Sequence, residues 1–397
     1  MLPNEDNDEA QPMPEVEKGD GGNGLPPRRP TAVGAGGPDD EFEDAIRELR
    51  RLDLDEGDEA ITEAFQSRPI PGLTFVRVDG IFRSWEIEEE EKNRNQRNTK
   101  QSGPTVLPKR TYLMEDALTG LNSQKAYISY IVLGNTKYVN FYMGLSLQST
   151  PQELEENEMA EICFDIQKAI LNCVQSNGID FHNKIYSSKD LKTKIEPLAK
   201  YVGITTGFAS LKHLSQSTLD SGQIERIVSG MKGLEFGLMV IAAPVPSKLV
   251  EDEEYIVLDQ IRKAQENGDT RMKRRIKYYL ELQEIYLKHI QLGKAIGHWQ
   301  VGVYFFAPKA EVFARLVSLI KATLTDEELR PTPLRIHVFE GLKEHLLDFG
   351  LLRNSRKDRT KSILFQYKFL TPLNSRMLSA YINLPKTDMP GFRVHRT

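Results

Sequence analysis

Cysteine is scarce in this 397-residue chain, and long apolar runs are missing. The two cysteines, Cys163 and Cys173, lie ten residues apart on one predicted helix, too far along its axis for a disulfide, so we interpret them as buried free thiols. No run of eighteen apolar residues occurs, so no membrane-spanning helix is predicted. Because the polar and acidic residues 1–5 are also unlike a secretory signal, we predict a cytoplasmic protein.

The sequence also lacks the glycine-rich loop that holds nucleotide phosphates. Such a P-loop needs Gly, any four residues, Gly-Lys and then Ser or Thr, so that backbone amides and the lysine converge on the β and γ phosphates. The single Gly-Lys pair, Gly293-Lys294, fails because Lys288 replaces the first glycine and Ala295 follows the lysine. We therefore expect this chain to bind neither ATP nor Mg²⁺ by the usual route.

Patterns typical of catalytic and metal sites are missing as well. The histidines show neither the i, i+4 pairing nor the adjacent glutamate of a zinc helix, and no Gly-x-Ser-x-Gly motif indicates a hydrolase nucleophile. Adjacent carboxylates such as Asp252/Glu253 lie in charge-rich helix starts, where a solvated face explains them better than acid/base catalysis. We predict no catalytic, cofactor-binding or metal-binding residues, while an enzyme of unrecognised type stays open. The seven histidines are His182, His213, His289, His298, His337, His345 and His395.

Charge is unevenly distributed along the chain. Residues 1–60 contain eighteen Asp or Glu and six Lys or Arg, so the overall net charge of −5 leaves +7 for residues 61–397. This positive bias is compatible with a nucleic-acid partner. Residues 1–40 are rich in Gly, Pro, Asp, Glu and Asn and poor in apolar residues, which predicts a disordered acidic tail.

Two apolar stripes on predicted helices are candidate contact surfaces. In the acidic helical segment 41–66, Phe42, Ile46 and Leu49 repeat at i, i+4 and i+7 and could bind a partner protein. Residues 276–290 carry a second stripe, which could mediate self-association. For both stripes, packing against the chain's own body is the alternative.

Residues 67–150 are predicted to form a β-rich subdomain. Residues 73–82 alternate like a strand, and the runs 127–133 and 137–145 flank Gly-Asn-Thr, which suits the positive φ of a tight turn. This is the strongest hairpin signal in the chain. Residues 86–108 have almost nothing to bury, which predicts a solvated polar insertion.

Residues 151–370 are predicted to form an α/β domain. The apolar runs 236–243 and 297–307 are typical of strands covered on both faces, and residues 247–292 have a helical pattern interrupted near residue 267. The predicted fold class is α/β (α+β), with a mixed sheet, packed helices and one long helix or helical hairpin. Other predicted elements are helices over 151–176, 223–232, 310–322 and 374–382 and a strand over 363–370.

Two basic clusters could meet nucleic-acid phosphates. One covers residues 271–277 on the predicted helical segment, and the other lies in a polar loop over 353–361. Because no aromatic residues interleave with these charges, a solvated face neutralised by Glu281 and Glu284 is the alternative. The candidate nucleic-acid-binding residues are Lys273, Arg274, Arg275, Lys277, Arg356 and Lys357.

Several segments, in the same order, are similar to the region that precedes the motor in bacterial ATPases of the HerA/FtsK-like group. They cover residues 139–145, 203–210, 224–231 and 297–304, followed by 370–394 with its Leu-Pro and Pro-Gly pairs. The resemblance implies a collar on a ring-shaped, homo-oligomeric, DNA-translocating ATPase. It also implies that residues 371–397 are a helix and linker toward an ATPase core, in cis or in trans, which binds ATP and Mg²⁺.

Two functions follow from this reading. The first is a non-catalytic assembly and docking module of such an ATPase, as in a defence or DNA-transfer system. The second is a self-contained nucleic-acid-binding or scaffold protein that uses the clusters 271–277 and 353–361.

Overall fold

A computed structural model describes residues 67–70, 72–83, 113–147, 179–210, 222–266, 273–325, 332–339, 341–353 and 362–396. The helices are α3 (Leu113–Ser123), α5 (Ser188–Ile195), α7 (Gln223–Gly230), α8 (Ser247–Glu266), α9 (Lys273–Ile296), α10 (Ala310–Leu324), α11 (Leu342–Leu347) and α12 (Ser375–Ser379). The strands are β1 (Ser67–Pro69), β2 (Thr74–Arg83), β3 (Ala126–Gly134), β4 (Val139–Leu147), β5 (Ile179–Ser187), β6 (Tyr201–Thr206), β7 (Phe236–Pro244), β8 (His298–Ala307), β9 (Arg335–His337), β10 (Gly350–Leu352), β11 (Thr371–Asn374) and β12 (Arg393–Arg396).

Ten of the described strands form one mixed sheet, ordered β12-β2-β4-β3-β7-β8-β6-β9, with β5 on β2 and β11 on β8. The pairing of β12 with β2 is parallel, and the other neighbours in this sheet are antiparallel. Strands β1 and β10 make a separate antiparallel pair. The predicted α/β class, a mixed sheet with packed helices, is confirmed.

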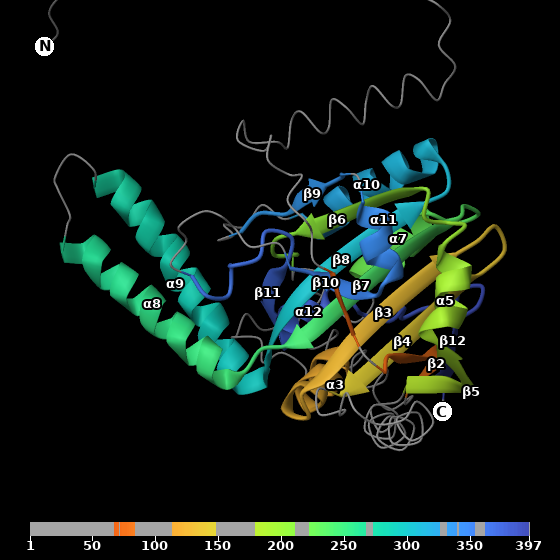
Figure 1. Cartoon of the computed structure of the whole chain (residues 1–397), viewed down its shortest axis with the longest axis horizontal. Helices are drawn as coiled ribbons and strands as arrows, with labels where there is room; N and C mark the ends of the chain where they lie inside the picture. Colours follow the sequence, from red (N-terminus) through yellow and green to blue (C-terminus); the bar gives the residue numbers. More distant parts are fainter. Residues whose placement is uncertain are drawn as a thin grey trace, which may run out of the picture.

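Helices cover both faces of the sheet (Figure 1). One face packs against α3, α7, α10, α12 and the base of the α8–α9 pair, and the other packs against α5 and α11. Because both faces are covered, every residue of β7 is buried, as its unbroken apolar run predicted. The sheet and its two cores combine residues from 67–150, 151–370 and 371–397, and the boundaries between these units stay a prediction.

The predicted hairpin is confirmed as β3 and β4, which pair from Ala126↔Leu147 to Gly134↔Val139. In its turn, the Asn135 Oδ1 atom accepts hydrogen bonds from the backbone N–H groups of Lys137 and Tyr138, both at 2.8 Å. A side-chain acceptor of this kind stabilises a tight turn through neighbouring residues alone, which is why the turn could be predicted from sequence.

The predicted helical segment 247–292 is a helical hairpin, formed by α8 and α9. Helix α8 leads the chain away from β7 and helix α9 leads it back to the sheet, where β8 pairs with β7 in the antiparallel direction. The predicted strand over 363–370 is wrong, because these residues form turns before β11 begins at Thr371. The backbone N–H groups of Ile363 and Leu364 donate instead to the Glu253 carboxylate, so they are unavailable to a strand.

Candidate interaction surfaces

The helices α8 and α9, which we call the arm, project from one end of the body (Figure 1). On α8 the buried side chains Val250, Glu253 and Val257 are spaced at i, i+3 and i+7, so they lie on one face of the helix. On α9, Tyr286 and Ile290 are buried in the same core. These contacts explain part of the predicted stripe 276–290 as packing within the chain.

A buried carboxylate anchors the base of the arm. The Glu253 side chain accepts hydrogen bonds from the Tyr286 hydroxyl at 3.1 Å, the Ser362 hydroxyl at 2.6 Å and the Ile363 backbone N–H at 2.6 Å. Burial, followed by the charge of Glu253, raises the pKa of Tyr286 well above its ordinary value. Because several donors satisfy the carboxylate, Glu253 serves folding, which argues against acid/base chemistry for the Asp252/Glu253 pair.

The Gly293-Lys294 pair belongs to this base too. The Lys294 Nζ atom lies 2.6 Å from a Glu254 carboxylate oxygen, and Gln291 donates to the same carboxylate at 3.2 Å. The hydrogen bond from Lys294 lowers the pKa of Glu254. Lys294, whose neighbours do not complete a P-loop motif, therefore forms an ion pair that connects α8 and α9.

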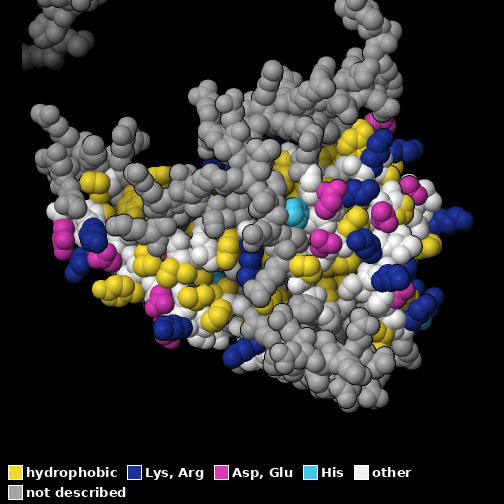
Figure 2. Space-filling model, in the orientation of Figure 1, with side chains coloured by type: hydrophobic (Ala, Val, Ile, Leu, Met, Phe, Trp, Pro, Cys, Tyr) yellow, Lys and Arg dark blue, Asp and Glu magenta, His cyan; other side chains and the backbone are white. Residues whose placement is uncertain are grey.

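On its faces that are not packed, the arm exposes large apolar side chains. Tyr255 is 74% exposed, Tyr278 53% and Leu258 46%. Side chains of this kind lie along the arm on the face seen in Figure 2. Such a concentration is typical of a contact site for another macromolecule. We call the following five residues the arm surface: Leu249, Tyr255, Leu258, Tyr278 and Tyr279.

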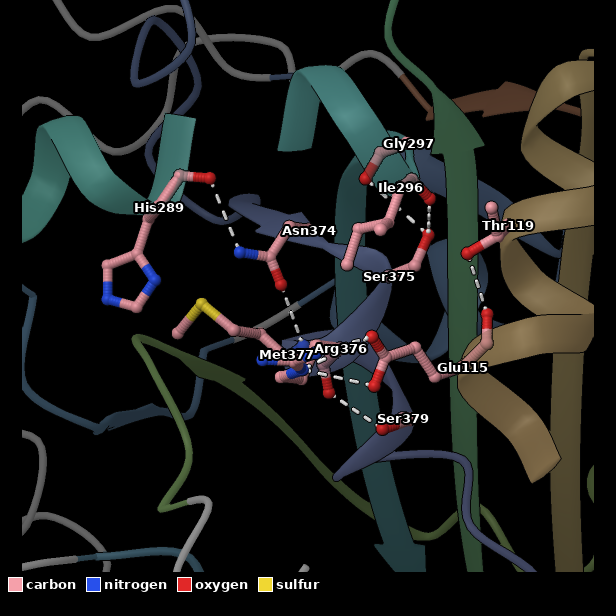
Figure 3. A network of polar contacts seen from close by, with 10 residues as sticks. All are labelled: Glu115, Thr119, His289, Ile296, Gly297, Asn374, Ser375, Arg376, Met377 and Ser379. Carbon is pink, nitrogen blue, oxygen red and sulfur yellow. Dashed lines mark hydrogen bonds and ion pairs between the residues drawn. The ribbon is translucent and has the colours of Figure 1, made fainter. Parts of the chain in front are cut away.

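The C-terminal residues contrast with the arm, because their polar groups are paired with the body (Figure 3). Asn374 caps α12 by accepting from the Met377 backbone N–H, and its amide donates to the His289 carbonyl oxygen. The Ser375 hydroxyl donates to the Ile296 carbonyl oxygen at 2.5 Å and accepts from the Trp299 indole N–H at 3.0 Å. These contacts connect α12 to the end of α9 and the start of β8.

An ion pair adds a further connection. The Arg376 guanidinium donates through Nε and Nη2 to the Glu115 carboxylate, with distances of 3.0–3.2 Å, and the Glu115 side chain is only 7% exposed. The Tyr381 hydroxyl donates to the Gly207 carbonyl oxygen at 2.8 Å. The described residues of 371–397 are thus part of the folded body, and their predicted role as a linker to an ATPase core stays a prediction.

A second candidate surface, which carries lysines, lies on α5 and β5. Lys189 and Lys192 are exposed on α5, and the Lys194 ammonium lies 4.4 Å from the ring centroid of Tyr186. The Lys184 ammonium lies 5.1 Å from the same ring. A capping box between Ser187 and Asp190 fixes the start of this helix. We call Lys184, Lys189, Lys192 and Lys194 the α5 surface.

The predicted nucleic-acid-binding residues are only partly described. Lys273, Arg274 and Arg275 form the first turn of α9, but their side chains lie outside the described part of the structure. Lys277 is 79% exposed, and its Nζ atom lies 3.9 Å from Glu281, as the alternative of a neutralised face predicted. Other predicted features lie outside the described residues: Arg356, Lys357, Phe42, Ile46, Leu49 and the segments 1–66, 86–108 and 151–176.

Among the described residues, no group of three or more His, Cys, Asp or Glu side chains is placed so that it could hold a metal ion. His298 is fully buried at the start of β8, and burial lowers its pKa to about 4. His182 and His395 lie at the surface, where a ring nitrogen of each is 2.9 Å and 3.1 Å from a carboxylate oxygen of Asp79 and Asp180, respectively.

Across the described ranges, no helix combines the length and the apolar character needed to cross a membrane.

The predicted stripe 276–290 includes Tyr278 and Tyr279 of the arm surface, but neither the α8 residues of the arm surface nor the α5 surface was predicted from sequence as a site. The available signal for the first was the position of Tyr255 on α8, opposite the buried stripe of Val250, Glu253 and Val257. For the second it was the lysine-rich stretch 184–200. No protein-family model matches this chain, and no curated protein matches it either.

Proposed function

We propose that this chain is a non-catalytic assembly and docking module of a HerA/FtsK-like, DNA-translocating ATPase. In this proposal it forms homo-oligomers in the cytoplasm and binds a motor that supplies ATP and Mg²⁺ chemistry. The observation that carries the docking role is the arm surface, where five large apolar side chains remain exposed on a projecting helical hairpin.

The assignment to this ATPase group is supported by the resembling segments. They lie in β4, β6, α7 and β8, which are strands of the central sheet or a helix packed on it. Segments separated by more than 150 residues in sequence thus belong to one folded unit. A module that precedes a motor domain, or binds it as a separate chain, needs to fold as one unit of this kind.

Co-purification tests the proposal. We expect an adjacent reading frame to encode a P-loop ATPase, and the tagged full chain to retain that ATPase on an affinity column. The variant Tyr278→Ser/Tyr279→Ser should lose it, because both rings are exposed on α9. The matched control is Tyr138→Ser, since Tyr138 is 47% exposed in the turn between β3 and β4, away from the arm.

Two results would overturn the proposal. One is equal recovery of the ATPase by the arm variant and the control. The other is ATP hydrolysis by the purified chain without a second protein, since the chain would then be a motor by itself.

Nucleic-acid binding is the second candidate function. It is favoured by the basic first turn of α9, where Lys273, Arg274 and Arg275 precede the exposed Lys277. If it is correct, the purified chain will bind duplex DNA with strong salt dependence. The triple variant Lys273→Ala/Arg274→Ala/Arg275→Ala will then lose most of this binding.

A further inference from the structure

The two surfaces lie at opposite ends of the molecule. Figure 1, viewed with the longest axis horizontal, shows the arm at one end and α5 at the other. One molecule can therefore present both surfaces at once, to two different neighbours. Contacts between unlike surfaces of identical chains are heterologous, and they produce rings or filaments.

The outer face of α8 is acidic as well as apolar. Glu251 and Asp252 are exposed, and they precede Tyr255 by four and three residues, so the three side chains lie on neighbouring parts of the same helical face. Leu258 follows Tyr255 by three residues and extends this face. The result is an apolar centre beside two carboxylates.

The α5 surface has the opposite charge. Lys189 and Lys192 are three residues apart and exposed, so their ammonium groups point from one face of α5. Lys184 and Lys194 lie beside them, oriented by the ring of Tyr186. Two exposed lysines on α5 can therefore meet two exposed carboxylates on α8.

We propose that the outer face of α8 in one molecule docks on the α5 surface of a second copy of the same chain, head to tail. This inference rests on the proposed assembly function and names the two surfaces that would perform it. Glu251 and Asp252 face Lys189 and Lys192 of the neighbour, while Tyr255 and Leu258 exclude water at the centre of the contact. Opposite charges steer the encounter and set its orientation, and the apolar centre supplies most of the affinity.

A second copy fits the α5 surface better than a nucleic acid does. A basic surface alone would suit either partner, but this chain carries an acidic and apolar counterpart at its opposite end. Tyr255 and Leu258 would have no role in holding a phosphate backbone. DNA binding by the α5 surface is the alternative that the experiment below distinguishes from the contact between copies.

Charge reversal and charge swap test the contact. The variant Lys189→Glu/Lys192→Glu should weaken self-association of the full chain at least about tenfold, measured by sedimentation velocity from about 1 to about 100 µM. The variant Glu251→Lys/Asp252→Lys should do the same. An equimolar mixture of the two variants should form hetero-oligomers, because each then offers the complementary surface that the other needs.

A matched control reverses two exposed basic residues elsewhere, in Arg315→Glu/Lys321→Glu on α10, and should leave self-association unchanged. Unchanged melting temperatures will show that all variants are folded. Raising NaCl from about 0.05 to about 0.5 M should weaken the wild-type contact, because exposed charges are screened.

Three results would overturn the inference. Self-association that survives both reversals would place the contact on other surfaces while leaving the assembly function intact. A wild-type chain that stays monomeric up to about 100 µM would remove the contact altogether, and the ATPase co-purification would then judge the proposed function separately. Loss of duplex DNA binding in Lys189→Glu/Lys192→Glu without any change in self-association would assign the α5 surface to nucleic acid.

Discussion

The arm and the C-terminal residues 371–396 contact the same body, but they differ in what their side chains meet. Leu378 and Tyr381 are buried, and Arg376 reaches a buried carboxylate. On the arm, Tyr255 and Leu258 point to solvent although they are of the same apolar types. The comparison separates two roles: paired and buried groups hold the fold, whereas exposed apolar groups are available to other molecules.

The same substitution in both regions should show the largest difference. Leu378→Ala removes a fully buried side chain and should lower the free energy of unfolding by about 2–5 kcal/mol through the cavity it leaves. Leu258→Ala, at a 46% exposed position, should cost far less. Urea denaturation measures both, and equal losses would show that the arm is as much part of the core as α12.

Acid should weaken the body rather than the outer part of the arm. Burial lowers the pKa of His298 to about 4 from an ordinary value of 6.5, so the unfolded chain binds this proton more readily than the folded one. Its contribution is fully present above pH 6.5 and is lost as the pH falls toward 4, by about 3 kcal/mol in total. His298→Gln should flatten the pH dependence of the urea midpoint over this window, and an unchanged slope would contradict the assignment.

Two ion pairs sharpen the comparison further. Arg376→Ala leaves the buried Glu115 carboxylate without its partner, and we expect a loss of about 2 kcal/mol, reduced from the fully buried case because Arg376 is 39% exposed. Lys277→Ala on the arm removes a solvated pair and should leave the thermal midpoint unchanged. A larger effect at Lys277 than at Arg376 would reverse the roles given to the two regions.

The smallest expected effect concerns two hydroxyl groups. Tyr381→Phe removes a buried hydrogen bond to the Gly207 carbonyl oxygen and should cost about 1 kcal/mol. Tyr255→Phe on the arm should leave the free energy of unfolding unchanged, because its ring is 74% exposed. Thermal unfolding with both variants in the same buffer tests this pair.

Much of the fold could be predicted where the signal is local. The β3–β4 turn depends on Asn135 and its immediate neighbours, and the strands β7 and β8 follow from unbroken apolar runs. The strand predicted over 363–370 is wrong, and the backbone N–H groups of its first two residues, Ile363 and Leu364, donate to Glu253, a residue more than 100 positions earlier in the chain. Nothing within the segment itself signals that contact.

The candidate surfaces were less accessible to sequence reasoning. The apolar residues of α9 occupy more than one face of the helix, so their pattern cannot separate the buried Tyr286 from the exposed Tyr278. Likewise, the lysines of α5 became a surface of interest only once the structure placed them at the end of the molecule opposite the acidic face of α8.

The amino-acid sequence by itself determined the helices α7 to α10 and α12, the buried strands β7 and β8 and the β3–β4 hairpin, because periodicity and turn chemistry act between residues a few positions apart. Tertiary structure decided that 371–396 packs into the body, that Glu115 and Glu253 are buried with partners, and that the arm leaves its tyrosines exposed. These outcomes depend on surfaces brought together from distant parts of the chain. Whether a charged or aromatic side chain is buried therefore depends on which helices and strands pack against it, and the sequence around that residue does not decide it.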